Sequence, residues 1–302
     1  MTAPALNLAA RPAAIARGIG FMVLAVFLFA VMDASIKWLS PRYDSWQIVF
    51  ARGVFALIPL SIMVARAGGP AVLRTRHVKA HVVRALVGIV SLWCVFYALG
   101  VMPLADAYAI FFAAPLFCTA LSVPMLGERV GPRRWAAVAV GFLGVLVMVK
   151  PSGDVLSQGA LLCLIGTVLY ALAVMMVRRM ASTESNEAIV MTFTLTTIFV
   201  GGIAMLPNWT TPSLADLPVF IAVGFFGGFA QWCITEAFRS APIAIVAPFE
   251  YTAMLWGVLF GWAVWGELPG ANIWFGAVLV IASGLYILHR ETRRKAEAPP
   301  KT

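Results

Sequence analysis

Charged side chains stand inside several long apolar stretches of this 302-residue chain. Asp33 and Lys37 are four residues apart, so they share one face of a helix, and Arg52 has a similar depth in the next stretch. Because an unpaired charge is costly in hydrocarbon, such residues pair with one another or face a polar cavity. Two interpretations follow for this trio: an ion pair that locks two helices, or a gate whose surplus positive charge attracts a solute carboxylate.

Two further charged sites lie in the second half of the chain. Glu236 and Arg239 form an i, i+3 pair near the end of an apolar stretch, a position typical of an anchor. Glu250 follows Pro248 and has no basic residue within its own stretch. Proline frees a backbone carbonyl and can bend a helix, and non-helical backbone is tolerated in a membrane where it lines a cavity. Glu250 is therefore a candidate for binding a solute ammonium group or for carrying a proton.

Aromatic side chains supply candidate walls for such a cavity. Tyr108 and Phe112 share a helix face, and Tyr251 follows Glu250 directly. Aromatic rings favour flat apolar or cationic solutes, although most rings in a membrane protein face lipid. The predicted solute-binding residues are Trp93, Tyr97, Tyr108, Phe112, Gln231, Trp232, Glu250 and Tyr251, and the predicted gating or ion-pair residues are Asp33, Lys37, Arg52, Glu236 and Arg239.

The elements that must position these residues are helices that cross a membrane. Apolar residues make up 62% of the chain and charged residues 12%, which is more apolar than a soluble core requires. A span needs about 20 apolar residues to cross roughly 30 Å of hydrocarbon. Ten stretches qualify, at residues 18–39, 46–66, 79–100, 104–126, 133–150, 158–178, 187–206, 217–238, 243–264 and 271–289. We therefore predict an all-α integral membrane protein with ten transmembrane helices.

The basic residues predict the orientation of these spans. Eighteen of the 22 lysine and arginine residues fall in the segments on one side, together with both termini, and two fall on the other side. Because cytoplasmic loops carry an excess of lysine and arginine, both termini are expected in the cytoplasm and the chain in the cell inner membrane. The net charge of +9 does not predict nucleic-acid binding, since the basic residues form short runs between spans and no basic stripe.

The second half of the chain repeats the first. A shift of 139 residues places Pro103 on Pro242, Gly127-Glu128 on Gly266-Glu267, and Trp135 on Trp274 without a gap. Five spans per half is an odd number, so the halves must be inverted, which is typical of secondary transporters; a symmetric scaffold is the alternative. We expect a first repeat at 1–150, a second at 151–290, and a disordered cytoplasmic tail at 291–302. The two Gly-Glu pairs are expected to end helices, and their glutamates to help close gates on opposite sides.

The chain resembles the drug/metabolite transporter superfamily, EamA type, in three features. It has two five-helix halves, its fourth and ninth spans close with Gly127-Glu128 and Gly266-Glu267, and the helix after the fourth span carries Gly141 and Gly144. Within it the pattern is most similar to bacterial aromatic amino-acid exporters. The resemblance implies export of small metabolites, most of all aromatic or hydrophobic amino acids. Nucleosides, nucleotide sugars or cationic compounds are the alternative solutes that it allows.

Other functional classes lack the residues that they need. The three histidines sit at or beyond span ends, and the sequence has no HExxH, GxSxG or Walker A motif, so we predict no enzyme and no ATP-driven pump. We expect no cofactor, metal or catalytic residue, and a monomer whose partners are its solute and the lipid bilayer. A membrane receptor or scaffold is the competing class, and it predicts binding without flux.

Overall fold

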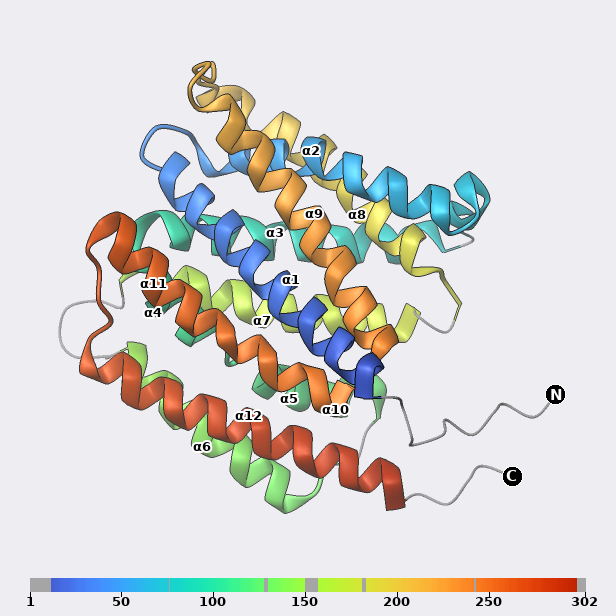
Figure 1. Cartoon of the computed structure of the whole chain (residues 1–302), viewed down its shortest axis with the longest axis vertical. Helices are drawn as coiled ribbons and strands as arrows, with labels where there is room; N and C mark the ends of the chain where they lie inside the picture. Colours follow the sequence, from blue (N-terminus) through green and yellow to red (C-terminus); the bar gives the residue numbers. More distant parts are fainter. Residues whose placement is uncertain are drawn as a thin grey trace.

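The structure, a computed structural model, describes residues 12–75, 77–127, 130–149, 157–180, 183–241 and 243–297. Within these ranges the chain is a bundle of helices (Figure 1). The elements are α1 Pro12–Leu39, α2 Ser45–Arg66, η1 Gly69–Leu73, α3 Val78–Val101, α4 Leu104–Phe111, α5 Ala114–Leu126, α6 Pro132–Val149, α7 Gln158–Met180, α8 Asn186–Ala204, η2 Leu206–Asn208, α9 Leu217–Ser240, α10 Ile243–Val246, η3 Ala247–Thr252, α11 Ala253–Trp265 and α12 Ala271–Glu297.

Helices dominate because a membrane offers the backbone no hydrogen-bonding partner other than itself. Side chains complete several ends: Asp44 accepts a hydrogen bond from the Trp46 N–H at the start of α2, and Ser185 accepts one from the Ala188 N–H at the start of α8. Within the described residues, eight helical segments are long and apolar enough to cross a membrane. The chain therefore has the composition and geometry of a multi-pass membrane protein.

All ten predicted spans fall on helical segments. Beyond the eight long ones, the spans predicted at 133–150 and 243–264 correspond to α6 and to the broken run α10, η3 and α11. One difference concerns the end of the chain, where a disordered tail was expected from residue 291. Helix α12 instead continues to Glu297, past Arg293 and Lys295, and residues 298–302 lie outside the described part.

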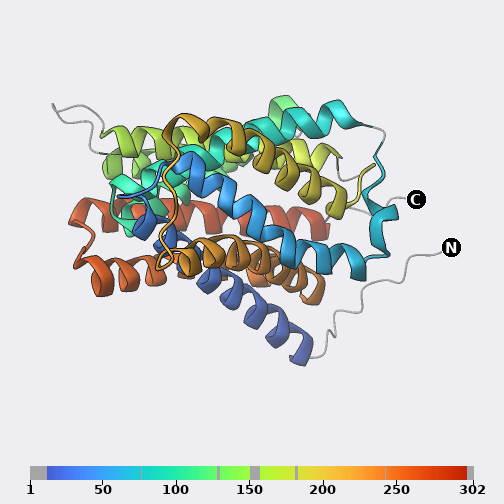
Figure 2. The same ribbon diagram turned by 90° about the horizontal axis from the view of Figure 1, so that it is seen from above.

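The bundle has two ends that differ in their contacts. Helix α1 begins and α12 finishes at one end, which we call the terminal end, as both views show (Figures 1 and 2). Lys37 and Glu267 mark the opposite, distal end. The run α4–α5 starts at the distal end, whereas α10–η3–α11 finishes there, so the two runs that the 139-residue shift relates are antiparallel.

Buried apolar side chains form one large core cluster of α1, α2, α3, α4, α7 and α9, and another of α4, α5, α6, α11 and α12. Two glycines end the related runs in the same way. Gly127 follows α5 and Gly266 follows α11, and both have φ of 67°, a left-handed conformation in which other residues are strained. The predicted helix-ending role of the Gly-Glu pairs agrees with these two glycines; Glu128 lies outside the described residues.

A buried polar contact ties α3 to the loop before α8 at the terminal end. The His81 Nε2 atom lies 3.0 Å from the Glu184 Oε2 atom, and the two side chains are 1% and 3% exposed. Hydrogen bonds from His81 and then Thr75 hold the pKa of Glu184 below its ordinary value of 4.5. The ionised carboxylate is therefore the form that stabilises this contact.

This contact predicts how stability depends on pH. A carboxyl group whose pKa is lower in the folded state contributes stability above its unfolded pKa, and this stability is lost as the pH falls through the folded value. Below pH 4.5 we expect the thermal midpoint of the purified protein to fall more steeply for the natural chain than for Glu184→Gln. Glu187→Gln, three residues away, is the control and should follow the natural chain; parallel curves for all three proteins would contradict the prediction.

Candidate functional site

The distal end is closed by a buried ion pair. The Lys37 Nζ atom lies 2.5 and 2.7 Å from the two carboxylate oxygens of Glu267, and it donates to the Met102 carbonyl oxygen at 3.0 Å. The same ammonium group lies 5.1 Å from the centre of the Trp265 ring. The Lys37 side chain is 7% exposed and that of Glu267 30%. The contact joins α1 in the first half of the chain to the α11–α12 loop in the second.

A second set of contacts closes the same end. Asp216 accepts hydrogen bonds from the Tyr43 and Ser213 hydroxyls, both at 2.8 Å, and pairs with Arg42 at 3.0 Å. The hydrogen bonds from Ser213 and Tyr43 hold the pKa of Asp216 below its ordinary value, so that it stays ionised at neutral pH. The loop after α1 is thereby fixed to the start of α9.

The predicted trio of Asp33, Lys37 and Arg52 is split by this arrangement. Lys37 points to Glu267, whereas Asp33 accepts a hydrogen bond from the Tyr108 hydroxyl at 2.8 Å. Arg52 lies within electrostatic range of Asp33, and its Nε atom is 3.5 Å from where a Cβ at Gly227 would stand. Asp33, Tyr108 and Arg52 therefore form a network, defined here as the central network, that links α1, α2 and α4 beside α9.

Two broken helices meet at the centre of the bundle. Helix α4 ends at Phe111 and α5 begins at Ala114, and the related run changes from η3 to α11 at Thr252. The Phe112 and Tyr251 rings, which the 139-residue shift relates, are in edge contact there, with centroids 5.1 Å apart. Broken helices with free backbone groups line the solute sites of many secondary transporters.

Close packing holds this junction in place on the distal side. Helix α4 packs on α11, where Gly257 faces Tyr108. A Cβ at Gly257 would lie 2.5 Å from the Tyr108 Cδ2 atom, so only glycine allows the two helices to approach this closely. Tyr108 therefore contacts the central network with its hydroxyl and α11 with its ring.

Two exposed side chains lie on the terminal side of the junction. Glu250 is exposed, and Tyr170 is 42% exposed. The Tyr170 ring lies 5.0 Å from that of Phe111, and its hydroxyl is within electrostatic range of Glu250, Cys118 and Arg84. Tyr170 thus lies near side chains of α3, α4, α5 and η3, and the role predicted for Glu250 stays a prediction.

The other predicted residues lie in separate groups. Trp93 stacks on Trp46 at 5.5 Å and contacts Tyr97 at 5.9 Å. Gln231 is exposed, and Trp232 stacks on Phe229 at 5.3 Å on the α9 surface that meets α1. Arg239 lies 3.4 Å and Arg17 3.9 Å from the Glu236 carboxylate at the terminal end.

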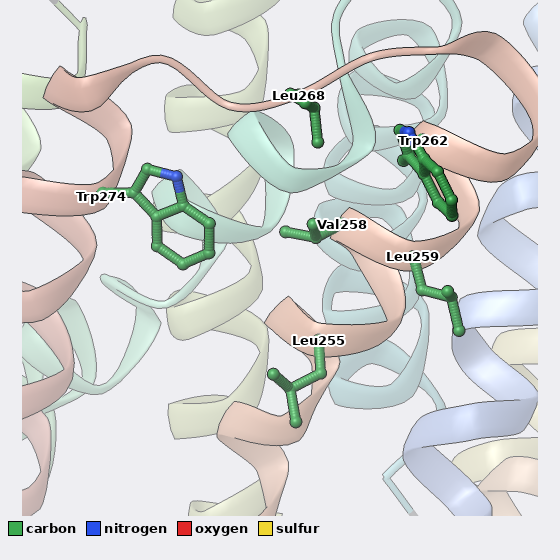
Figure 3. Close-up of a pocket in the computed structure, with 6 residues that line it drawn as sticks. All are labelled: Leu255, Val258, Leu259, Trp262, Leu268 and Trp274. Atoms are coloured by element: carbon green, nitrogen blue, oxygen red, sulfur yellow. The ribbon is translucent and has the colours of Figure 1, made fainter.

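A groove between α11 and α12 is apolar and lies on the outer surface (Figure 3). Its lining residues are Leu255, Val258, Leu259, Trp262, Leu268 and Trp274. Leu255 and Leu268 are each 67% exposed. The lining offers no charged side chain, so this groove suits lipid chains and not a polar solute.

Three residues of interest were not predicted as site residues. Arg84 and Tyr170 lie within electrostatic range of each other, and Asp106 lies within electrostatic range of Lys37 and Glu267. Asp106 is an acid inside a predicted span, so the reasoning applied to Asp33 would have found it. Arg84 was counted among the basic residues that set orientation, and Tyr170 had no distinguishing neighbour in the sequence.

Comparisons with known proteins agree with a transporter fold. A riboflavin transporter of Rhizobium johnstonii is 30% identical, over 96% of this chain and 96% of the relative. An S-adenosylmethionine uptake transporter of Rickettsia prowazekii is 26% identical, over 91% and 94%. The pseudopaline exporter CntI of Pseudomonas aeruginosa is 30% identical, over 88% and 94%. A solved crystal structure matches the fold with a TM-score of 0.62 at 19% identity, covering 95% of this chain and 100% of that one.

The profile of the EamA-like transporter family matches this chain twice, at residues 16–150 and 157–288. The two matches together span most of the chain, and the relatives are transporters of small molecules, not enzymes. Antiparallel broken helices are typical of secondary transporters. The chain therefore belongs to the EamA-like transporter family.

Proposed function

We propose that this protein moves a small amphipathic organic solute across the cell inner membrane by alternating access between two inverted five-helix repeats. Its expected role is the export of aromatic or hydrophobic amino acids. The observation that carries the proposal is the junction of the broken helices at Phe112 and Tyr251, beside the exposed Glu250. The junction lies on the terminal side of the ion pairs that join the helices at the distal end.

The direction of loading follows from this asymmetry. The terminal end carries most of the arginine and lysine residues, so the positive-inside rule places it in the cytoplasm. A solute would then enter from the cytoplasm, reach Glu250 and the aromatic junction, and leave when the distal contacts separate. Both termini are accordingly expected in the cytoplasm.

The solutes named for the relatives extend the set of candidate solutes that should be tested. Riboflavin and S-adenosylmethionine each combine a flat ring system with polar groups, and so do the aromatic amino acids. A ring of this kind can stack against Phe112 and Tyr251, while Glu250 offers a negative charge to an ammonium or sulfonium group. The shared chemistry, a flat ring next to charged groups, supports the proposal more than any single relative does.

The test is uptake of radiolabelled solutes into proteoliposomes that contain only this protein. We expect saturable flux of tryptophan or phenylalanine, with riboflavin and S-adenosylmethionine as the alternative solutes and uridine as a nucleoside comparison. Each is measured with and without an imposed pH gradient, which separates facilitated diffusion from proton coupling. Saturable binding without flux for every solute would favour a receptor or scaffold and contradict the proposal.

A variant of the aromatic junction tests whether the transported solute contacts Phe112. Phe112→Ala should raise the Michaelis constant about fivefold to tenfold, because an aromatic contact contributes about 1 kcal/mol and the truncation also removes contact area. Phe275→Ala truncates a ring that is 72% exposed on the outer surface, and it should leave the flux unchanged. Equal constants for the natural chain and Phe112→Ala would exclude the junction as a solute contact.

A further inference from the structure

Two sets of contacts at opposite ends of the bundle join its first half to its second. At the distal end, the Tyr43 hydroxyl donates to Asp216 at 2.8 Å, and the Tyr43 ring contacts that of Phe220 with centroids 4.9 Å apart. The Gln47 amide group also exchanges two hydrogen bonds with the backbone of Thr210, at 2.7 and 3.2 Å. We call this set the distal tether. It fixes the loop between α1 and α2 to the start of α9.

The second set, the terminal tether, lies at the other end. The buried side chains of His81 and Glu184, 3.0 Å apart, join α3 to the loop between α7 and α8. The Ser185 hydroxyl, next in the chain, donates to the Val72 carbonyl oxygen in the segment before α3. Both tethers therefore follow one plan, in which the loop after the first helix of one repeat is fixed to the start of the third helix of the other.

The internal repeat makes the two tethers equivalent. Helices α3 and α9 are related by the 139-residue shift at both ends, so His81 of α3 corresponds to Phe220 of α9. Tyr43 and Glu184 correspond as well, because each directly precedes the residue whose side chain caps α2 or α8. The contact of Glu184 with His81 is thus the counterpart of the contact of Tyr43 with Phe220.

This equivalence bears on how the bundle can move. Because the repeats are alike and inverted, the opposite-facing state is reached when they exchange conformations, and a contact at one end is then replaced by its counterpart at the other. Both tethers are closed in the same structure, and this exchange replaces each tether by the other. Each tether is therefore expected to be closed in both states.

We propose that both tethers stay closed throughout the transport cycle, and that the distal end opens where Lys37 separates from Glu267. This inference rests on the proposed transport function and identifies its moving parts. The α1–α2 loop moves together with α9, and the α7–α8 loop moves together with α3, so each part combines segments of both repeats. The packing agrees with this division, since α1 and α2 pack along α9 and α7 packs along α3.

Reversible cross-links test which contacts must separate. Each of three proteins has its four native cysteines replaced by alanine and carries one new pair: Tyr43→Cys with Asp216→Cys, His81→Cys with Glu184→Cys, or Lys37→Cys with Glu267→Cys. In proteoliposomes a short bifunctional methanethiosulfonate links each pair, and dithiothreitol releases it. Linking either tether should leave the flux within about twofold of the released protein, whereas linking positions 37 and 267 should lower it about tenfold or more, because the distal-open state is removed.

A second measurement needs no transport. Met102→Cys is added to each protein, and mass spectrometry follows the labelling of position 102 by a membrane-impermeant maleimide after the pair has been linked. Met102 is 9% exposed beneath the Lys37 contact, so its labelling measures opening of the distal end. With either tether linked, the rate should match that of Met102→Cys alone in the same background. With positions 37 and 267 linked, it should be about tenfold lower.

Two further pairs guard against variants that fold poorly. Cysteines at Gln47 and Thr210, or at Val72 and Ser185, link the same tethers without changing Tyr43 or His81. A tenfold loss of labelling on linking either tether, or no labelling of position 102 in any protein, would overturn the inference. The expected labelling pattern without flux of any solute would overturn the transport proposal alone.

Discussion

Replacing Lys37 by methionine is expected to unseal the distal end of the bundle. Lys37 is 7% exposed, and its ammonium group is neutralised by Glu267 and hydrogen-bonded to the Met102 carbonyl oxygen. Removing one partner of a fully buried pair costs about 3–5 kcal/mol. Glu267 is 30% exposed, so water compensates part of this cost, and we expect the closed state to lose about 1.4 kcal/mol. The population open at the distal end should rise about tenfold.

Cysteine labelling in membranes measures this opening. Met102 is 9% exposed beneath the ion pair, so a cysteine there should react slowly with a membrane-impermeant maleimide while the distal end is closed. The four native cysteines are replaced by alanine so that the maleimide can label only the cysteine at position 102. Lys37→Met should then increase the labelling rate about tenfold, and Glu267→Gln should act in the same direction.

A double variant distinguishes the ion pair from general loosening. Lys37→Met with Glu267→Met replaces two charges by apolar side chains of similar length, which is often neutral or stabilising in a buried site. Its labelling rate should return to that of the natural chain or fall below it. If the single variants label no faster than the natural chain while folding normally, the ion pair does not hold this end closed.

The elements of the fold could be predicted because local rules determine them. Apolar length sets the spans, and the 139-residue shift relates the two broken helices and the two glycines with φ of 67°. The residue at which each helix breaks is harder to predict from the sequence. Pro115 and Pro248 lie near the breaks, but they are not equivalent under the shift, and the contact between Phe112 and Tyr251 requires the two runs to be antiparallel and adjacent.

Partner choice in the site could not be predicted, because it depends on contacts between distant segments. Helical spacing placed Asp33 and Lys37 on one face, yet Lys37 pairs with a residue 230 positions away and Asp33 with one 75 positions away. Sequence spacing predicts which side chains share a helix face. The partner of each charged side chain, however, depends on which residues the neighbouring helix presents to that face. Arg84 shows a related limit: a basic residue near a span end counts toward orientation in the sequence, whereas its stacking on Phe193 turns it inward.

The central network is expected to give the largest loss of stability in the protein. Asp33 lies within electrostatic range of Arg52, and the Arg52 Nε atom is buried without a hydrogen-bond acceptor among the described residues. Asp33→Asn leaves this arginine without its counter-charge, so we expect the free energy of unfolding to fall by about 3 kcal/mol. Tyr108→Phe removes one hydrogen bond to Asp33 but leaves the charges, so it should cost about 1–2 kcal/mol.

A double-variant cycle separates the two roles that the sequence left open for Asp33. Asp33→Asn with Arg52→Gln removes both charges, so it should be destabilised by less than the sum of the single changes, with a coupling of roughly 2 kcal/mol. Thermal unfolding in detergent measures stability, and flux per folded protein measures transport. A structural lock predicts that the double variant regains both stability and flux. A gate predicts that stability returns while flux stays low, because the cycle then lacks the charges that must separate and re-form as the solute passes.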